Sequence, residues 1–581
     1  MAGFDDFSPV DGQAGLQNAY GKYRLTHPSA WMICGALLFL VLATRFISGR
    51  RAESVQVNDT TQTVPAVPYW LPFLGHIPSM ATDADRFVKG LRTSYAQGIF
   101  ALNFGGTRHN VMYTPGLATA LLNQKHTFAD SDKVARGLMQ SVFGFPAQEM
   151  DKYDAALADL MTCYKYLTSD PELGDMVRRT ADRLRVTVKD LVTFNDSVVD
   201  QMQWERSSDV RITKDKRGKQ VMEASLLPLI RDYTAHTANP AIMGTDFLAN
   251  FPEFFDHMWN FDRGFLLLAT GLPRWAPIPM LTRAHIARKR LLDTIGVYHE
   301  AMEKEANGED PGPKWTSLDD AGKLVQARME VYRKHKLSIR ARASLENSLM
   351  WASNANSDML VFWMINRIYA DKALLEMIRE EIAPFAQLVE PEQEFKVDEP
   401  PRFESFDVEG LCNQCPLLKS CYVECLRLDT ASWSLKVVQQ DFVLQSRDKE
   451  ERGWLLRKGD YAHAAHDLHN TDPKHFQDPL VFKADRHIKE DDDKKKTADL
   501  GSIRPYGGGT SMCKGRVFAF KECMMFTAAI VSMWEIESAG GGPWKMPRHR
   551  KATGVYGTSD NPRVWLRRRV LEKPGTIDAN M

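Results

Sequence analysis

The sequence predicts a mainly helical α+β fold with small β-sheets, preceded by one N-terminal membrane-spanning helix. Residues 323–383 contain neither glycine nor proline, which indicates extended helices. Stretches with strand character come late in the chain, at 433–438, 454–457 and 564–567. A charge-free apolar run lies near the N-terminus, at 30–44. Helices that come first and strands that come late are typical of a mainly helical body with small sheets.

The composition limits the classes of protein to consider. The chain has 581 residues, enough for one very large domain or a few ordinary ones. Its formal net charge of zero gives no reason to expect a nucleic-acid partner. Hydrophobic residues make up 44%, which is ample for a large core. Eight cysteines in so long a chain argue against a disulfide scaffold and favour reduced thiols in the cytosol.

Residues 29–47 are predicted to form a membrane anchor. As a helix this stretch is about 28 Å long, close to the thickness of the hydrocarbon core. Arg45, Arg50 and Arg51 come at its end or directly after it, so the positive-inside rule keeps the body of the chain in the cytosol. A secretory signal peptide is the alternative, but the polar N-terminus, residues 1–28, is long and contains several aspartates.

After the anchor we expect a basic and proline-rich linker, residues 48–78, and one catalytic body, residues 79–581. Prolines at the density of the linker prevent a helix and stiffen the chain. Within the body, 337–370 would make one helix of about 50 Å. A second helix would follow at 371–382, ended by Pro384.

Three other segments of the body have distinct compositions. Residues 308–314 and the charge run 491–496 are predicted to be solvated loops. Residues 265–279, FLLLATGLPRWAPIP, are apolar but interrupted by prolines, so they are too short to span a membrane. This segment either dips into the membrane near a substrate entrance or packs as an ordinary loop.

The most informative residue is Cys513, within the sequence PYGGGTSMCKGR that precedes a predicted helix at 517–522. Glycines let backbone N–H groups crowd around the sulfur, and a helix N-terminus favours its negative charge. A thiolate held in this way can ligate haem iron and donate electron density that favours O–O cleavage. The alternative is a buried structural thiol in a turn.

This stretch resembles the haem-binding signature of the cytochrome P-450 superfamily, F-x-x-G-x-R-x-C-x-G. Tyr506 stands in the aromatic place, Gly509 in the glycine place, Cys513 in the ligand place and Gly515 in the last place. The resemblance implies haem b (iron protoporphyrin IX) as the cofactor, with Cys513 as its metal ligand. Ser511 stands where a basic residue usually pairs with a haem propionate, and the N-terminal third shows no W-x-x-x-R element. The propionate partners therefore stay unassigned.

Two further signatures follow in family order. Residues 415–427 resemble the E-x-x-R helix, with Glu424 and Arg427 three apart on one helix face. Residues 478–486 resemble the meander that supplies a second arginine, Arg486. Such a Glu–Arg spacing alone is usually a surface pair. Three signatures in order are far more specific, and they imply a buried network that fixes the cysteine loop.

Four cysteines near the E-x-x-R helix offer an alternative use of the same segment. Cys412, Cys415, Cys421 and Cys425 could together bind zinc. Because two of them would lie inside that helix and face a packed core, buried free thiols are favoured.

The predicted long helix departs from the superfamily where the oxygen chemistry takes place. The usual A-G-x-D/E-T relays protons to dioxygen through an acid and a threonine, and here the sequence is WASNANS. The resemblance gives Ala352, Ser353 and Asn356 as catalytic-site residues. Ala355 replaces the acid and Asn356 the threonine, and an amide cannot exchange protons at neutral pH as a carboxyl can. Ser357 would face about 100° away. Either water relays the protons or the enzyme needs no relay.

The same segment, with Phe362 and Trp363 and the meander at 468–483, resembles one branch of the superfamily. That branch contains cholesterol and oxysterol 7α-hydroxylases, sterol 12α-hydroxylase and prostacyclin synthase. It implies a microsomal enzyme, single-pass in the endoplasmic reticulum membrane with a cytosolic catalytic domain. The enzyme would insert one oxygen atom from O2 into an apolar steroid- or terpenoid-like substrate, as part of steroid, terpenoid or specialised metabolism.

Electrons would come from NADPH through a separate NADPH–cytochrome P-450 reductase, because the chain has no flavin or nucleotide fingerprint. Lys514, Arg516 and Lys521 could dock such an acidic partner or be ordinary surface charge. An electron-independent isomerase or dehydratase of the prostacyclin-synthase type is the alternative, and a haem-containing sterol-binding protein without turnover is a third. The sequence does not identify the substrate or the carbon attacked.

Overall fold

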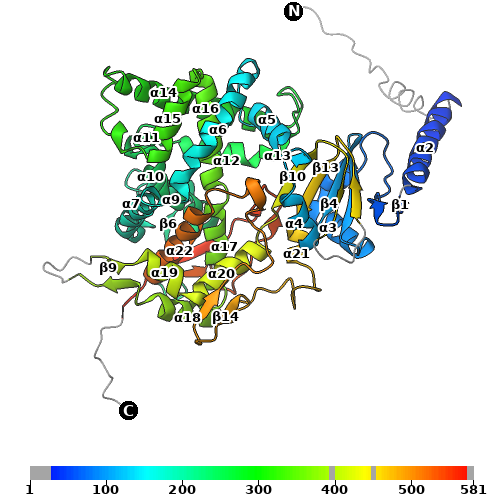
Figure 1. Ribbon diagram of the computed structural model, residues 1–581. Coiled ribbons are helices and arrows are strands. Elements are labelled where there is room, and N and C mark those ends of the chain that lie inside the picture. Colours follow the sequence, from blue (N-terminus) through cyan, green and yellow to red (C-terminus); the bar gives the residue numbers. More distant parts are fainter. Residues whose placement is uncertain (1–27, 51, 392–398, 447–452, 572–581) are drawn as a thin grey trace, which may run out of the picture.

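The computed structural model describes residues 28–50, 52–391, 399–446 and 453–571 (Figure 1). A large helical part lies beside a smaller β-rich part, and the N-terminal helix α2 (Pro28–Gly49) projects from the β-rich side. Within α2, Trp31–Gly49 has a mean hydropathy of 2.0 and is only 6% buried. This helix is long and apolar enough to cross a membrane, and it includes the predicted anchor at 29–47.

The β-rich part joins strands from the two ends of the chain. In its larger sheet, β13 runs parallel to β4 with Tyr461 opposite His109, although more than 300 residues separate them. The larger sheet has the order β3 (Ile99–Phe104), β4 (Thr107–Met112), β13 (Tyr461–Ala465), β10 (Trp433–Val438) and β5 (Ala129–Asp130). The smaller has the order β1 (Gln56–Asn58), β2 (Thr61–Thr63), β12 (Gly453–Leu456) and β11 (Phe442–Leu444).

The predicted strands all overlap observed ones. The stretch 433–438 is β10, 454–457 overlaps β12, and 564–567 lies within β19. A four-stranded sheet has the order β16 (Trp534–Ser538), β19 (Arg563–Arg568), β7 (Gln220–Ser225) and β6 (Arg211–Lys214). Three hairpins pair β8 (Ala386–Val389) with β9 (Arg402–Phe406), β14 (Ile488–Glu490) with β15 (Lys496–Ala498), and β17 (His549–Arg550) with β18 (Gly557–Thr558). The predicted loop at 491–496 is the turn of the β14–β15 hairpin, except that Lys496 belongs to β15.

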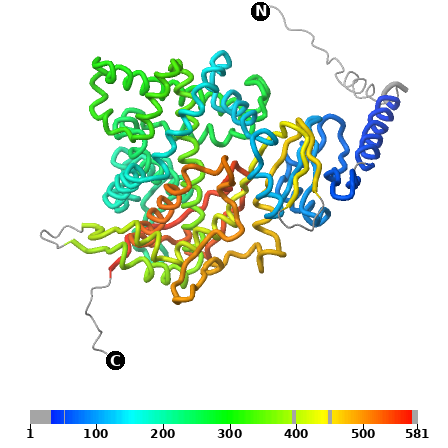
Figure 2. Tube along the Cα trace, in the orientation of Figure 1, coloured from blue at the N-terminus to red at the C-terminus, as the bar shows by residue number. Residues whose placement is uncertain are grey.

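The helical part surrounds α22, whose residues from Glu522 to Met533 are all buried. Figure 2 shows this C-terminal segment, in orange, passing through the middle of the molecule. The α-helices of this part and of the β-rich part are α3 (Ile77–Ser94), α4 (Pro115–Leu122), α5 (Asp132–Ser141), α6 (Met150–Cys163), α7 (Glu172–Thr187), α8 (Gln203–Ser207), α9 (Leu226–Ala238), α10 (Pro240–Met243), α11 (Thr245–Asn250), α12 (Phe254–Arg263), α13 (Phe265–Ala269), α14 (Pro279–Ala306), α15 (Lys323–Lys334), α16 (Ile339–Asn354), α17 (Ser357–Tyr369), α18 (Lys372–Ile382), α19 (Val408–Gln414), α20 (Pro416–Leu428), α21 (His466–Asn470) and α22 (Arg516–Met533).

The prediction of one continuous helix over 337–370 is wrong. Helix α16 begins at Ile339, after Ser338, whose hydroxyl accepts a hydrogen bond from a backbone N–H of the first turn. The helix is interrupted at Ala355 and Asn356, and α17 continues from there. Both residues keep right-handed backbone angles (φ −58° and −107°), so the break is a local turn. Its physical reason is a contact with the distant Val555, described below. The predicted helix at 371–382 corresponds to α18.

Candidate active site

A cavity of about 610 Å³ lies between the break of the central helix and the loop that precedes α22. Its lining includes Ala352, Ser353 and Asn356 from the central helix and Tyr506, Cys513 and Gly515 from the loop. Six of the predicted site residues therefore line one space. Gly509, Glu424, Arg427 and Arg486 do not line it. Apolar side chains also line this cavity: Leu122, Met161, Leu167, Ile242, Leu324, Leu349, Leu360, Leu426, Val555 and Phe518.

The cysteine loop is held in shape by glycine geometry and by one backbone bond. The N–H of Cys513 donates to the carbonyl of Tyr506 at 3.1 Å. Gly509 has φ +62°, and a Cβ at this position would lie 2.3 Å from the carbonyl oxygen of Leu122. No larger residue fits there without moving backbone. The hydroxyl of Tyr506 is hydrogen-bonded to that of Tyr422 on α20, which ties the loop to the E-x-x-R helix.

Opposing effects act on the Cys513 thiol. Burial raises its pKa, whereas the N–H groups of Gly515 and Arg516 and the charges of Arg516 and Lys514 lower it. The net direction is upward, although Cys513 itself is open to the cavity. The sequence argument considered only the effects that lower the pKa. A metal ion displaces the proton on binding, and the same N–H groups then stabilise the sulfur anion.

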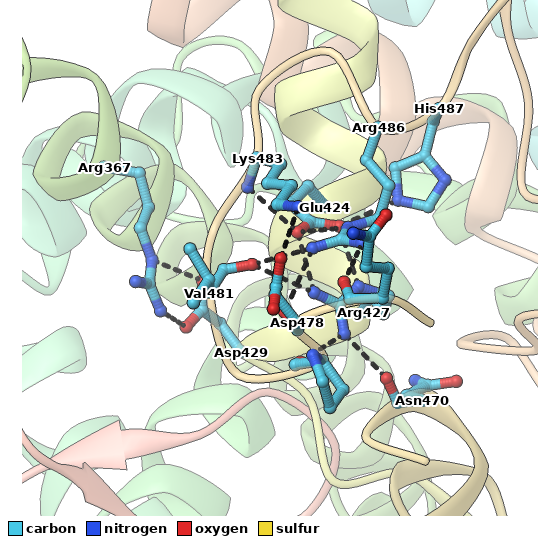
Figure 3. Close-up of polar contacts among 12 residues, drawn as sticks. Arg367, Glu424, Arg427, Asp429, Asn470, Asp478, Val481, Lys483, Arg486 and His487 are labelled. Carbon is cyan, nitrogen blue, oxygen red and sulfur yellow. Dashed lines mark hydrogen bonds and ion pairs between the residues drawn. The ribbon is translucent and has the colours of Figure 1, made fainter. Parts of the chain in front are cut away.

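Behind this loop, Glu424 binds three cationic or imidazole side chains (Figure 3). Arg427 makes a two-pronged contact with it, through Nε at 2.8 Å and Nη2 at 2.7 Å. Arg486 Nε donates to Glu424 Oε1 at 2.9 Å, and His487 Nε2 lies 2.9 Å from Oε2. Sequence reasoning missed His487, which directly follows Arg486. Burial opposes ionisation of Glu424, but these partners outweigh it and lower its pKa to about 2.

The same arginines bind the meander. Arg427 Nη1 donates to the carbonyls of Asn470 at 2.7 Å and Pro479 at 2.6 Å. Arg486 donates to the carbonyl of Gln477 at 2.6 Å. The network therefore connects α20 to the irregular segment that precedes the cysteine loop. Figure 3 draws these contacts. A fully paired buried network of this kind rigidifies what surrounds it.

Asn356, at the break of the central helix, is hydrogen-bonded to a loop that is distant in the sequence. Its side-chain Oδ1 accepts a hydrogen bond from the N–H of Val555 at 2.9 Å, across 199 residues of sequence. A Cβ at Gly554 would lie 2.3 Å from this oxygen, so the glycine allows the close approach. No hydrogen-bond partner of Asn356 Nδ2 is found in the part of the chain that the structure describes. Ser357, expected to face away from Asn356, also lines the cavity because the helical spacing is interrupted just before it.

A buried lysine lines the cavity and was not found from the sequence. Lys436 on β10 is 2% exposed, and its ammonium donates to the carbonyls of Leu122 at 3.1 Å and Gln124 at 3.4 Å. Burial lowers its pKa. A cation with remaining donor capacity beside the cavity is suited to an acidic group, such as a haem propionate. The available signal was a charged residue within the apolar strand WSLKVV.

The four cysteines of the alternative zinc site are buried and free. Burial raises the pKa of each of Cys412, Cys415, Cys421 and Cys425. Across the described residues, no three His, Cys, Asp or Glu side chains are grouped so that they could hold a metal ion. We therefore treat these thiols as part of the core.

The cavity fits a flat iron-bearing group. A Cβ at Gly515 would meet no protein atom within 4 Å, so protein packing does not demand glycine there, whereas a planar ligand against the loop would. Cys513 offers a soft ligand for iron and Lys436 a cation for acidic substituents. This geometry, on a mainly helical α+β fold, defines the haem-thiolate oxygenases.

Comparison with known proteins agrees with this class. The sequence model of the family Cytochrome P450 matches residues 202–560, more than half of the chain. The chain belongs to the cytochrome P450 family; it is a P450 monooxygenase, an oxidoreductase with a haem-thiolate cofactor.

Three relatives illustrate where the chain stands in the family. It is 24% identical to Cytochrome P450 monooxygenase efuG of Hormonema carpetanum, over 90% of this chain and 92% of that one. It is 24% identical to Cytochrome P450 7B1 of Mus musculus, over 89% and 92%. It is 28% identical to cholesterol 7-alpha-monooxygenase of Cricetulus griseus, over 48% and 51%. The predicted resemblance to the superfamily and to this branch is confirmed.

Proposed function

We propose that the protein is a membrane-anchored monooxygenase that inserts one oxygen atom from O2 into an apolar, steroid- or terpenoid-like substrate. The observation that carries this proposal is that Cys513 lines the same cavity as Ala352, Ser353 and Asn356. Bound haem b would supply the activation of dioxygen, favoured by electron donation from the cysteine sulfur.

The chain's own residues hold and isolate the reacting groups. Cys513 would bind the haem iron, Lys436 would pair with an acidic substituent of the haem, and the Glu424 network would keep the cysteine loop rigid. Leucines such as Leu349 and Leu360 exclude water and contact the substrate. The free Nδ2 of Asn356 donates a hydrogen bond to an oxygen atom in the cavity.

Two observations support the substrate class and pathway. The cavity wall is dominated by aliphatic side chains, which suit a rigid hydrocarbon skeleton. One relative is named for action on cholesterol, and others are named as monooxygenases of Hormonema and Penicillium species. We place the enzyme in steroid, terpenoid or secondary-metabolite biosynthesis.

The membrane arrangement follows from exposed apolar surface. We propose a single-pass protein of the endoplasmic reticulum with a cytosolic catalytic domain. The segment 265–279 contains the short helix α13 and leaves Trp275 84% exposed and Leu266 50% exposed. Side chains of this kind in water are costly, and at a bilayer surface they are anchors. This supports the membrane interpretation of the segment. Residues 1–27 lie outside the described part of the chain.

A separate NADPH–cytochrome P-450 reductase would supply electrons at the face behind Cys513. Of the three basic residues considered for docking, Lys521 is paired with Glu409 and Arg516 donates to the carbonyl of Cys513 at 2.9 Å. Lys514 Nζ donates only to a backbone carbonyl, that of Thr510, at 3.3 Å. Within the described residues neither Lys514 nor Arg516 forms an ion pair, so both keep their charge for an acidic partner.

The test uses the full-length protein in lipid vesicles with the reductase, NADPH and a panel of sterols and terpenoids. We expect product only when NADPH, reductase and O2 are all present. We also expect the carbon-monoxide spectrum of the reduced haem to show thiolate ligation. Cys513→Ser should lose that spectrum, whereas Cys412→Ser, which removes a buried thiol away from the cavity, should keep it. Product that forms without NADPH and reductase would establish the isomerase alternative.

A further inference from the structure

A second cavity, with a volume of about 380 Å³, lies beside the active-site cavity and has no role in the proposed function. Val555 lines both cavities. A volume of this size is within the range of small-molecule binding sites. Three arginines from three different elements line the second cavity: Arg231 on α9, Arg263 on α12 and Arg550 on β17. This convergence of positive charge is the feature that needs an explanation.

The guanidinium groups of α9 and α12 are positioned by neighbouring residues and keep unused hydrogen-bond donors. Arg231 Nε donates to Asp232 at 3.1 Å, and its guanidinium carbon lies 4.2 Å from the centre of the Trp259 ring. Arg263 Nε donates to the backbone carbonyl of Trp259 at 3.3 Å. In the part of the chain that the structure describes, the Nη groups of neither arginine have a hydrogen-bond partner. Both side chains can therefore bind an acceptor in the cavity.

Arg550 lies against the β17–β18 hairpin. Its partner in the pairing of the two strands is Gly557. A Cβ at Gly557 would lie 3.1 Å from Arg550 Nη2, so a larger residue there would displace the guanidinium. Among the described residues, no carboxylate lies within ion-pair distance of Arg550 or of Arg263. The hairpin thus provides a guanidinium whose charge is not neutralised by a direct partner.

The three positive charges act on one another. Burial lowers the pKa of Arg263, and the charges of Arg231 and Arg550 lower it further. Like charges that are brought together in a partly buried place destabilise a fold unless an opposite charge lies between them. An anion bound among the three guanidinium groups would remove this repulsion. Arginine is also the side chain best suited to bind a planar carboxylate through two parallel hydrogen bonds.

Four aspartates line the same cavity, and two of them already have cationic partners. Asp232 is paired with Arg231 at 3.1 Å. Asp560 is paired at 2.9 Å with Arg548, which does not line the cavity. These two carboxylates therefore do not neutralise the guanidinium groups of α12 and β17.

The other two aspartates, Asp256 and Asp262, limit the charge of a ligand. Asp262 Oδ1 accepts a hydrogen bond from Trp351 Nε1 at 2.9 Å. Burial raises the pKa of both carboxyl groups. When ionised, they would repel a dianion such as phosphate more strongly than a single carboxylate. The charges of the cavity therefore favour a monoanion.

We propose that the second cavity is a binding site for a small organic acid with one carboxylate. Arg263 and Arg550 hold the carboxylate through their Nη groups. The hydrocarbon part of the acid lies against Leu227, Met359 and Val555, which give the cavity an apolar side. Because this binding needs neither electrons nor O2, the site goes beyond the proposed function and does not depend on it.

Calorimetric titration of the full-length holoenzyme in lipid nanodiscs tests the class of ligand. The probes are cyclohexanecarboxylate and cyclohexylmethanol, which share a ring and differ in charge, and inorganic phosphate. At pH 7 we expect the acid to bind about tenfold more tightly than the alcohol, because hydrogen bonds between guanidinium and carboxylate are charge-assisted. Phosphate should bind more weakly than the acid. Equal affinities for the acid and the alcohol, or tighter binding of phosphate, would overturn the proposal.

Variants test the location of the site. Arg263→Gln and Arg550→Gln should each weaken binding of cyclohexanecarboxylate about tenfold and leave that of cyclohexylmethanol unchanged. Arg263→Lys keeps the charge but loses the planar fork, so it should weaken binding of the acid by less. The matched control is Arg283→Gln, because Arg283 is exposed and its charge also lowers the pKa of Arg263, yet it does not line the cavity.

We expect wild-type affinity for the acid in Arg283→Gln. A tenfold loss in this control, or wild-type affinity in both glutamine variants of the cavity, would refute the site. Thermal unfolding midpoints show which variants are folded, and the comparison of Arg263→Gln with Arg263→Lys decides the matter if Arg550→Gln does not fold.

Discussion

Glu424 and the pair of Asp358 on α17 and Glu522 on α22 are equally buried, yet they are in opposite states. Glu424 meets two arginines and a histidine within 2.9 Å, and its pKa falls to about 2. The pair meets no cation at hydrogen-bond distance within the described residues, and burial raises its pKa values. Burial alone therefore does not decide what an acid does. Whether hydrogen-bonding and cationic partners are present decides whether the buried acid is ionised or neutral.

The largest effect is expected where the pairing is complete. Arg427→Met leaves Glu424 charged and short of its main partner, so we expect a loss of about 3–5 kcal/mol of stability. Thermal unfolding in detergent measures it. The control is Lys483→Met, which removes an exposed ion pair with Asp478 and should cost about 1 kcal/mol or less. Equal losses in the two variants would mean that the Glu424 network is not structural.

Glu424 and Glu522 should change the free energy of unfolding in opposite directions as the pH rises. The lowered pKa of Glu424, about 2 against 4.5, contributes stability above pH 4.5 that is lost as the pH falls toward 2, up to about 3 kcal/mol. The raised pKa of Glu522, about 8, contributes in the opposite sense: its share is complete below pH 4.5 and is lost as the pH rises through 8. Unfolding midpoints of wild type and Glu522→Gln between pH 5 and 8 check this. Parallel curves would contradict it.

Replacing the unpaired acids with apolar side chains should stabilise the protein. Asp358→Val combined with Glu522→Met removes three carboxyl oxygens without partners, and we expect a gain of about 1–2 kcal/mol in the free energy of unfolding. Glu424→Met, the same exchange at the paired site, should destabilise instead. A loss of stability in the double variant would show that the pair has partners that the structure does not reveal.

The smallest effect is expected at Asn356. Asn356→Ala leaves the N–H of Val555 without its acceptor and should cost about 1 kcal/mol, with lower coupling. Asn356→Asp keeps the acceptor but loses the Nδ2 donor, so it should retain stability while coupling falls. Coupling equal to wild type in both variants would remove Asn356 from the chemistry.

Site residues that lie close to their partners along the sequence could be predicted from the sequence. Glu424 and Arg427 share one helix turn, and Cys513 lies within its own glycine loop, so local pattern was sufficient. Strand β10 was also predicted to the residue. The roles of these site residues stay proposals that the variants above test.

Features that depend on distant contacts could not be predicted. The break between α16 and α17 contains neither glycine nor proline, so the sequence did not predict it. It lies where Asn356 accepts a hydrogen bond from the N–H of Val555, 199 residues further along the chain. The burial of Lys436, Asp358 and Glu522 likewise depends on packing between distant strands and helices. Each had one faint signal, a charged residue within an apolar run such as FAFKECMMFTAA.

Val555 lines both the active-site cavity and the cavity of about 380 Å³ beside it. Its backbone N–H donates to the side chain of Asn356, which holds it close to the central helix. The side chain of Val555 therefore contributes to the wall of each cavity. Trimming or enlarging that side chain would change the room for a bound molecule while leaving the cysteine sulfur and the residues of the central helix in place. Selection can in this way retune the range of compounds accepted by an enzyme of this kind without redesigning its chemistry.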